Sequence, residues 1–199
     1  TLIMPIPKSI YVAIFTLTAS IGVVFGLIAS LQDDLGFADG ILGLIAAAAF
    51  FSAVVAQLLL APLADRGHTK ILMAGAIMIA ALGSLWFAVA SSAWELILAR
   101  LLTGLGIGAF APAARAVVAN ADPSRAGERL GRLTAVETSG FVAGPVVGAF
   151  INEIWGLKAP FLTFFCALVV ILPSLLRVKF PSPPVKSKAV SYTHLTLPT

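Results

Sequence analysis

The chain has 199 residues, of which 59% are hydrophobic and 11% charged, and its mean hydropathy is +1.02. A water-soluble domain does not normally carry so apolar a composition, so a soluble globular protein is excluded and a membrane protein is indicated. The net charge of +4 does not indicate a nucleic-acid partner, because the basic residues cluster in short connectors between apolar runs.

Six apolar windows follow one another along the chain, each close to the length of a membrane-spanning helix. About 20 residues at roughly 1.5 Å each cross a hydrocarbon core of about 30 Å, and a helix satisfies its own backbone polar groups in lipid. The windows cover residues 9–31, 41–63, 71–90, 94–119, 133–154 and 159–176. We therefore predict an all-α membrane protein with six transmembrane helices.

These windows divide the chain into a short segment over 1–8, a six-helix bundle over 9–180 and a polar, proline-rich linker over 181–199. The last letters, SYTHLTLPT, resemble read-through from cloning or sequencing adapters, so we expect a non-native tail there. We expect the first window to stay in the protein, because its apolar stretch is too long for a cleaved signal peptide.

Charge alternates between successive connectors. One set of connectors and the two ends hold most of the basic residues, namely Lys8, Arg66, Lys70, Arg125, Arg129, Arg132, Arg177, Lys179, Lys186 and Lys188. The other connectors hold Lys158 together with Asp33, Asp34, Asp39 and Glu153. The positive-inside rule then predicts that both ends lie in the cytoplasm. We expect an integral protein of the plasma (inner) membrane.

The fifth window carries glycines at four-residue spacing. Gly140, Gly144 and Gly148 fall within about 40° of one another at about 100° per residue, so one side of the helix lacks side chains. Another backbone can approach that side closely. Pro145 removes one helix hydrogen bond, leaves the carbonyl of Phe141 free and favours a kink. Ordinary packing of small residues explains the same spacing.

Together with Gly131 and Pro145, these three glycines form a longer pattern. The full spacing of Gly131, Gly140, Gly144, Pro145 and Gly148 resembles the antiporter motif of the drug:proton antiporter families in the major facilitator superfamily. Ala149 stands where that motif usually has a second glycine.

Two further groups of residues resemble motifs of the same superfamily. Leu63, Ala64, Asp65, Arg66 and Lys70 resemble its signature cytoplasmic loop, with departures at Ala61, His68 and Thr69. In the fourth window, its arginine-and-glycine motif is matched by Arg100, Thr103, Gly104, Gly106 and Gly108. The resemblance covers about residues 8 to 180.

The resemblance implies an architecture of twelve helices in two six-helix halves around a cavity that opens to either side in turn. It identifies this chain with the amino-terminal half and implies the missing carboxyl-terminal half as a partner. In the family, the aspartate equivalent to Asp65 docks on that other half, so Asp65, Arg66 and Lys70 form a candidate gating loop. The alternative is a set of solvated charges that only determine orientation.

Arg100 lies about six residues, or roughly 9 Å, below the interface marked by Trp94 and Glu95, where an unpaired guanidinium is costly. It therefore either snorkels to the interface or serves as a cavity charge or proton-relay element. Gly104, Gly108, Ala111 and Arg115 continue its stripe along one side of the helix.

Arg115 and Glu137 form a second candidate group. They lie at similar depths, about 6 and 8 Å from the cytoplasmic ends of two antiparallel helices. Glu137 also falls on the glycine side of its helix. They are either a structural ion pair or a gating pair that responds to protons.

We therefore expect a transporter that moves small molecules by alternating access, coupled to protons and exporting drug-like or amphipathic compounds. Many such exporters carry a membrane-embedded acidic residue in the first window, and this chain has none there. Glu137 is then the main candidate for proton coupling, with Asp33 and Asp34 as secondary candidates. The aromatic side chains that either line a greasy cavity or face lipid include Phe25, Phe50, Phe51 and Phe110.

Three alternatives to export remain at this point: a metabolite facilitator, an uptake symporter, or a membrane receptor or assembly module. An enzyme is not expected, because no catalytic constellation is present, and neither a cofactor nor a metal site is predicted.

Overall fold

The computed structural model describes residues 7–65 and 68–178, except for the side chains at 61 and 63–65. Nearly all of the predicted segment 1–8, and the whole of the linker 181–199, lie outside these residues. The helices within them are α1 (Lys8–Gly22), η1 (Val23–Gly26), α2 (Ile28–Leu35), α3 (Asp39–Asp65), α4 (Thr69–Val89), α5 (Ala93–Ala121), η2 (Pro123–Arg125), α6 (Ala126–Trp155) and α7 (Ala159–Leu176).

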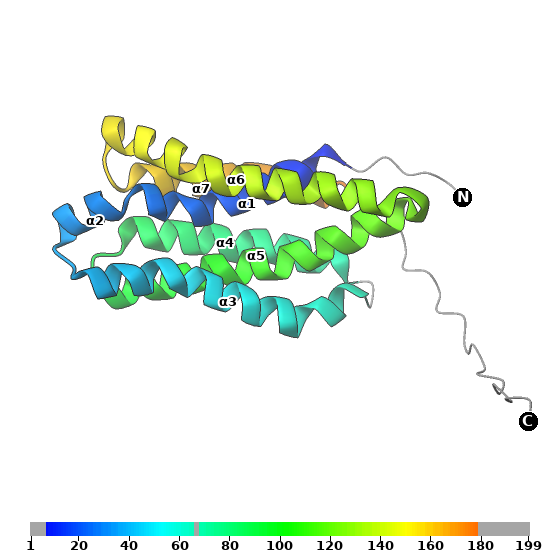
Figure 1. The fold of residues 1–199 in the computed structure, drawn as a ribbon, viewed down its shortest axis with the longest axis horizontal. Coiled ribbons are helices and arrows are strands. Elements are labelled where there is room, and N and C mark those ends of the chain that lie inside the picture. Colours follow the sequence, from blue (N-terminus) through cyan, green and yellow to red (C-terminus); the bar gives the residue numbers. More distant parts are fainter. Residues whose placement is uncertain (1–6, 66–67, 179–199) are drawn as a thin grey trace, which may run out of the picture.

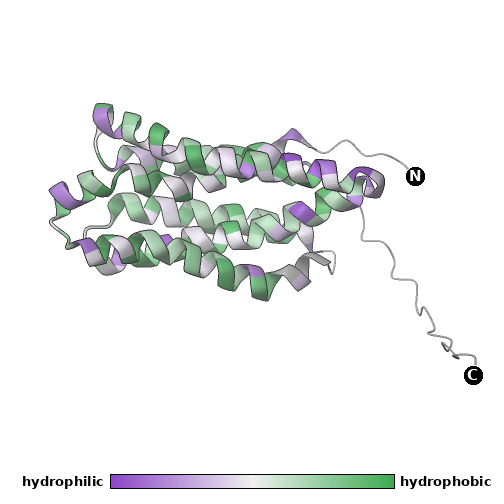
Figure 2. Ribbon diagram, viewed as in Figure 1, coloured by the Kyte–Doolittle hydropathy of each residue, from purple (hydrophilic) through white to green (hydrophobic). Residues whose placement is uncertain are grey.

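All six predicted spans are confirmed as helices that are long and apolar enough to cross a membrane. The long helices run side by side along one axis (Figure 1). Hydrophilic residues gather toward the two ends of the bundle, while apolar residues dominate its middle (Figure 2). Many large apolar side chains are exposed along the outside, as a lipid-facing surface requires.

The first span differs from the prediction of a single helix. α1 ends at Gly22, a tighter 3₁₀ turn follows in η1, and α2 begins at Ile28. Gly22 and Gly26 flank this break, and glycine is a poor helix former. α2 in turn ends at Gly36, whose φ of 68° is a left-handed conformation that suits glycine at a helix end.

Local signals also explain where α5 begins. The Ser92 hydroxyl accepts a hydrogen bond from the backbone N–H of Glu95, at 3.4 Å. The Glu95 carboxylate in turn accepts one from the backbone N–H of Ser92, at 3.0 Å. This reciprocal capping box satisfies two donors at the helix start.

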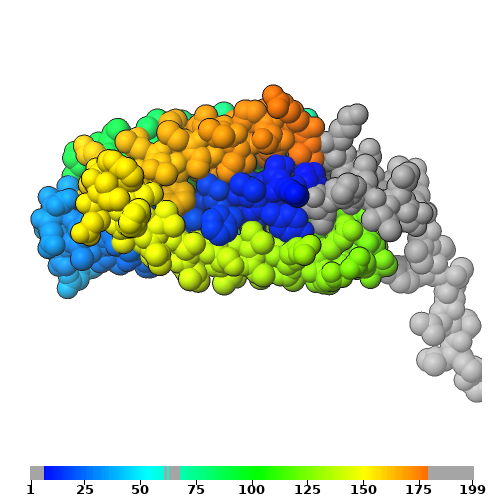
Figure 3. All heavy atoms as spheres, turned by 90° about the horizontal axis from the view of Figure 1, so that it is seen from above, coloured from blue at the N-terminus to red at the C-terminus, as the bar shows by residue number. Residues whose placement is uncertain are grey.

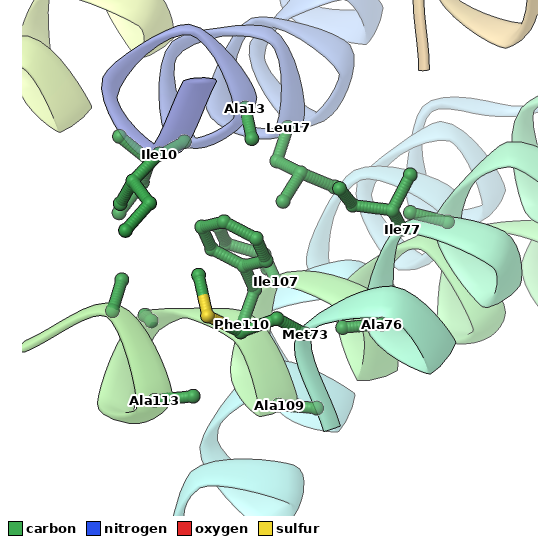
Figure 4. Close-up of a cluster of buried hydrophobic side chains, with 14 of the residues drawn as sticks. Ile10, Ala13, Leu17, Met73, Ala76, Ile77, Ile107, Ala109, Phe110 and Ala113 are labelled. Atoms are coloured by element: carbon green, nitrogen blue, oxygen red, sulfur yellow. The ribbon is translucent and has the colours of Figure 1, made fainter. Parts of the chain in front are cut away.

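Helix α5 packs between α3 and α4 (Figure 1). On the other side of the bundle, α1 packs between α6 and α7 (Figure 3). Phe110 of α5 is fully buried and lies among apolar side chains of α1 and α4, including Leu17, Met73 and Ile77 (Figure 4). Phe110 therefore belongs to the packed core rather than to a cavity wall or a lipid-facing surface.

The two ends of the bundle differ in charge. We call one the basic end, since it carries Lys8, Lys70, Arg125, Arg132 and Arg177. We call the other the acidic end, because Asp33, Asp34, Asp39 and Glu153 lie there with Lys158. Because successive helices run antiparallel, the charges that alternate between connectors along the chain collect at the two ends of the bundle.

Candidate functional site

The glycine side of α6 faces α1 and η1. A Cβ atom built on Gly140 would overlap the carbonyl oxygen of Phe15, and one on Gly144 would overlap that of Ala19. At Gly148 the overlap would be with the side chain of Val23. The two backbones therefore approach more closely than side chains on α6 would allow.

Glycines on the other helix complete this seam. A Cβ on Gly22 would lie 3.2 Å from Pro145 Cδ, and one on Gly26 would overlap the Pro145 carbonyl. Helix α6 continues through Pro145 without a break. Because Pro145 contacts both Gly22 and Gly26, it lies beside the break between α1 and α2. Sequence reasoning missed Gly22 and Gly26, although their four-residue spacing within an apolar run was a usable signal.

Gly131 stands apart from the seam. It is exposed, and a Cβ built on it would meet no described atom within 4 Å. The motif spacing that linked it to the other glycines therefore does not place it in the same helix contact.

The small residues of α5 serve two other contacts. Gly104 and Gly108 lie against the backbone of α3 at Ala49 and Ala53, while Gly106 faces α4 at Ala76. The stripe that continues from Arg100 is thus a packing surface over most of its length and does not line an open cavity.

Arg100 is almost completely buried, with 1% of its surface exposed. Its Nη2 donates a hydrogen bond to the carbonyl of Ile21 at 2.9 Å, and its Nη1 donates one to the carbonyl of Ser20 at 3.3 Å. Both acceptors lie in the last turn of α1, where carbonyls have no partner within their helix. The guanidinium therefore caps the broken helix instead of reaching the interface.

Arg115 and Glu137 meet, joining α5 to α6. Nη2 of Arg115 donates to both carboxylate oxygens of Glu137, at 2.9 and 3.1 Å. The side chains keep 39% and 21% of their surface exposed, so the pair is reachable from outside the packed core. A partly exposed ion pair costs less to separate than a dry one, which suits a contact that opens and closes.

The candidate gating loop is described only in part. Lys70 is exposed in the first turn of α4. The Asp65 side chain and all of Arg66 lie outside the described residues.

A cluster of charged and polar side chains lies at the connector between α5 and α6. Asp122 accepts a hydrogen bond from the Ser124 hydroxyl at 2.6 Å and lies 3.5 Å from Nη2 of Arg129. The Ser124 bond, helped by the Arg129 cation and opposed by burial, holds the pKa of Asp122 below its ordinary value. Sequence analysis used Arg129 as an orientation signal and did not single out Asp122 or Ser124; the Asp-Pro-Ser sequence was the available sign of an ordered turn.

Three aromatic rings meet between η1, α3 and α6. The ring centroids of Phe25, Phe50 and Phe141 lie 5.8 to 5.9 Å from one another in tilted or edge-on contacts. Phe25 and Phe50 keep about two-fifths of their surface exposed. We call these residues the ring cluster; neighbouring Phe51 takes no part in it. Among the side chains that the structure describes, no group of His, Cys, Asp and Glu could hold a metal ion.

Comparison with known proteins agrees with this geometry. The family model for the Major Facilitator Superfamily matches residues 10–197. The chain is 27% identical to the quinolone resistance protein NorA of Staphylococcus aureus (strain MRSA252) over 187 residues, which is 94% of this chain and 47% of that protein. It is 31% identical over 131 residues to the multidrug resistance protein MdtG of Klebsiella pneumoniae (strain 342), covering 65% of this chain and 31% of MdtG.

The fold also resembles a solved structure. The inward-open conformation of the xylose transporter XylE from E. coli superposes with a TM-score of 0.72 at 16% identity, over 89% of this chain and 48% of XylE. The chain thus spans about half the length of NorA and of XylE, as predicted for one six-helix half.

Proposed function

The chain belongs to the Major Facilitator Superfamily, and from this premise we propose that the complete protein exports apolar, aromatic small molecules in exchange for protons. Export would proceed by alternating access between two six-helix halves in the plasma membrane. The basic end would face the cytoplasm, in keeping with the positive-inside rule. The names of NorA and MdtG, a quinolone resistance protein and a multidrug resistance protein, support drug-like substrates.

The observation that carries proton coupling is the Arg115–Glu137 pair. Glu137 is the one acidic residue well inside a span, and its carboxylate is held by a single guanidinium nitrogen. Protonation would cancel the attraction that joins α5 to α6 at this point. A proton would then release the contact, and loss of the proton would restore it.

The ring cluster supports the substrate class. Its rings come from three separate helices, two of which, α3 and α6, have no extensive contact with each other in the described part. Exposed ring faces attract apolar and aromatic compounds and offer few hydrogen-bonding groups. A substrate that inserts between these rings would replace contacts of both α3 and α6, and so could change how these two helices sit relative to each other.

The exposed flanks of α3 and α6 support docking of the missing half. On α6, a shallow groove is lined by Thr138, Ser139, Val142, Ala143, Val146 and Val147. On α3, the exposed apolar side chains include Leu44, Phe51, Val54 and Leu58. We propose that the carboxyl-terminal half covers these flanks and leaves the ring cluster between the two halves.

Proton exchange is tested with the purified complete transporter in liposomes that contain a pH-sensitive dye. An imposed outward gradient of a fluorescent, uncharged aromatic compound should drive protons inward, and empty liposomes should show no such signal. Substrate flux without proton movement would indicate a facilitator and refute exchange. Protons moving in the same direction as the substrate would indicate a symporter and also refute it.

A further inference from the structure

A cavity lies at the acidic end of the bundle and includes none of the ring-cluster residues. It has a volume of about 390 Å³ and is enclosed by α2, the end of α4, the start of α5 and the connector between α6 and α7. This volume falls within the usual range for small-ligand pockets, roughly 300 to 1,000 Å³. The cavity is separate from the Arg115–Glu137 pair and shares no residue with it.

The floor of the cavity is apolar and rigidly packed. Leu31, Phe87, Leu96 and Phe161 all line it, and each is nearly buried in the core beneath. The rings of Phe87 and Phe161 lie 4.1 Å apart between centroids, at an interplanar angle of 32°. A ligand on this floor would meet a preformed aromatic and aliphatic surface.

The rim carries one charge of each sign. Asp34 of α2 and Lys158 of the connector both line the cavity and are exposed. Neither forms an ion pair within the part of the chain that the structure describes. Trp155 completes the rim with 68% of its surface exposed, and such exposed tryptophans are typical of the lipid headgroup level.

We propose that this cavity binds the headgroup of phosphatidylethanolamine from the adjacent leaflet. Lys158 would bind the phosphate, while the Asp34 carboxylate would accept hydrogen bonds from the primary ammonium group. The glycerol and upper acyl chain would lie on the apolar floor. An anionic headgroup fits less well, because it would meet Asp34 with no cation to offer, close to Asp33 and Glu153.

Trp155 provides a direct reporter. In the complete transporter, every other tryptophan is replaced by phenylalanine, and the protein is placed in phosphatidylglycerol nanodiscs. A minor fraction of lipid brominated on the acyl chains is then added, as either phosphatidylethanolamine or phosphatidylglycerol. Both lipids offer a phosphate to Lys158, so only the pair between Asp34 and the ammonium group distinguishes them. One exposed ion pair predicts that brominated phosphatidylethanolamine quenches Trp155 about one and a half- to fivefold more strongly.

The matched control keeps Trp94 as the sole tryptophan, because it lies at the same end and is 75% exposed but does not line the cavity. Trp94 should show no preference between the two lipids. Replacing both rim charges, Asp34→Asn with Lys158→Gln, should remove the preference at Trp155 without disturbing the core. Equal quenching of Trp155, an equal preference at Trp94, or a preference that survives the double substitution would each overturn the proposal.

Discussion

Arg100 and Arg115 lie on one helix and accommodate a membrane-embedded charge in different ways. Arg115 is partly exposed and has a carboxylate partner, whereas Arg100 is buried and donates only to backbone carbonyls of α1. Those carbonyls sit at a helix end, which carries partial negative charge and lacks internal donors. Arg100 therefore stabilises the break in the first span, and the break in turn supplies the acceptors for Arg100.

Removing the guanidinium should destabilise the fold. Arg100→Ala leaves two buried carbonyls without this donor, at about 1–3 kcal/mol for each unsatisfied group. We expect a clear fall in the unfolding temperature of the complete transporter in detergent. Arg132→Ala is the matched control, because Arg132 is exposed and makes no hydrogen bond or ion pair to another described residue. Similar unfolding temperatures for the two variants would show that the Arg100 contacts contribute little.

Sequence reasoning was uneven among these residues. Helix depth alone predicted that Arg115 and Glu137 would meet, because both charges belong to side chains visible in the sequence. The partners of Arg100 are backbone atoms, and nothing in a side-chain pattern marks which carbonyls a helix break releases. The ring cluster was predicted only in part: Phe25 and Phe50 were candidate cavity residues, but their contacts with each other and with Phe141 were not foreseen, since the three rings come from separated segments.

The contact between α1 and α6 is built from glycines on both helices, and it is the element-scale feature most sensitive to added volume. Gly144→Val would force the backbones apart at Ala19, because a packed interface cannot absorb the added atoms. We expect membrane insertion to persist, since valine is apolar, while transport is lost. Insertion is measured by membrane fractionation and transport by substrate efflux.

Gly131→Val is the control for this variant, as it makes the same change at a position with no described atom within 4 Å of a Cβ. It should retain transport. Normal efflux in Gly144→Val would mean that the α1–α6 seam is not required to stay closed during the cycle.

Hydropathy predicted the six spans well because membrane insertion depends on the apolar length of each segment. It did not predict that the first span breaks into α1, η1 and α2, since the residues around the break stay apolar throughout. Which glycines pair with which helix was likewise hidden, because Gly104, Gly106 and Gly108 are close in sequence yet face two different helices. Those assignments depend on tertiary packing.

At the scale of the whole molecule, we propose that the chain supplies one wall of a transport path. In the proposed transporter, the exposed flanks of α3 and α6, the ring cluster and the Arg115–Glu137 pair would all act together with a second half. Helices α1, α3, α4, α5 and α6 make close backbone contacts at glycines, whereas the ion pair is a polar contact that a single proton could change. We therefore place the coupling step at Glu137.

Efflux by the complete transporter, measured with and without an imposed pH gradient in Glu137→Gln and in Glu137→Gln with Arg115→Gln, tests this assignment most directly. Both variants should lose gradient-driven efflux, because neither can carry the proton. The double variant should still exchange substrate passively, because it leaves no unpaired charge. Gradient-driven efflux at the wild-type rate in Glu137→Gln, or its recovery in the double variant, would contradict a coupling role for Glu137.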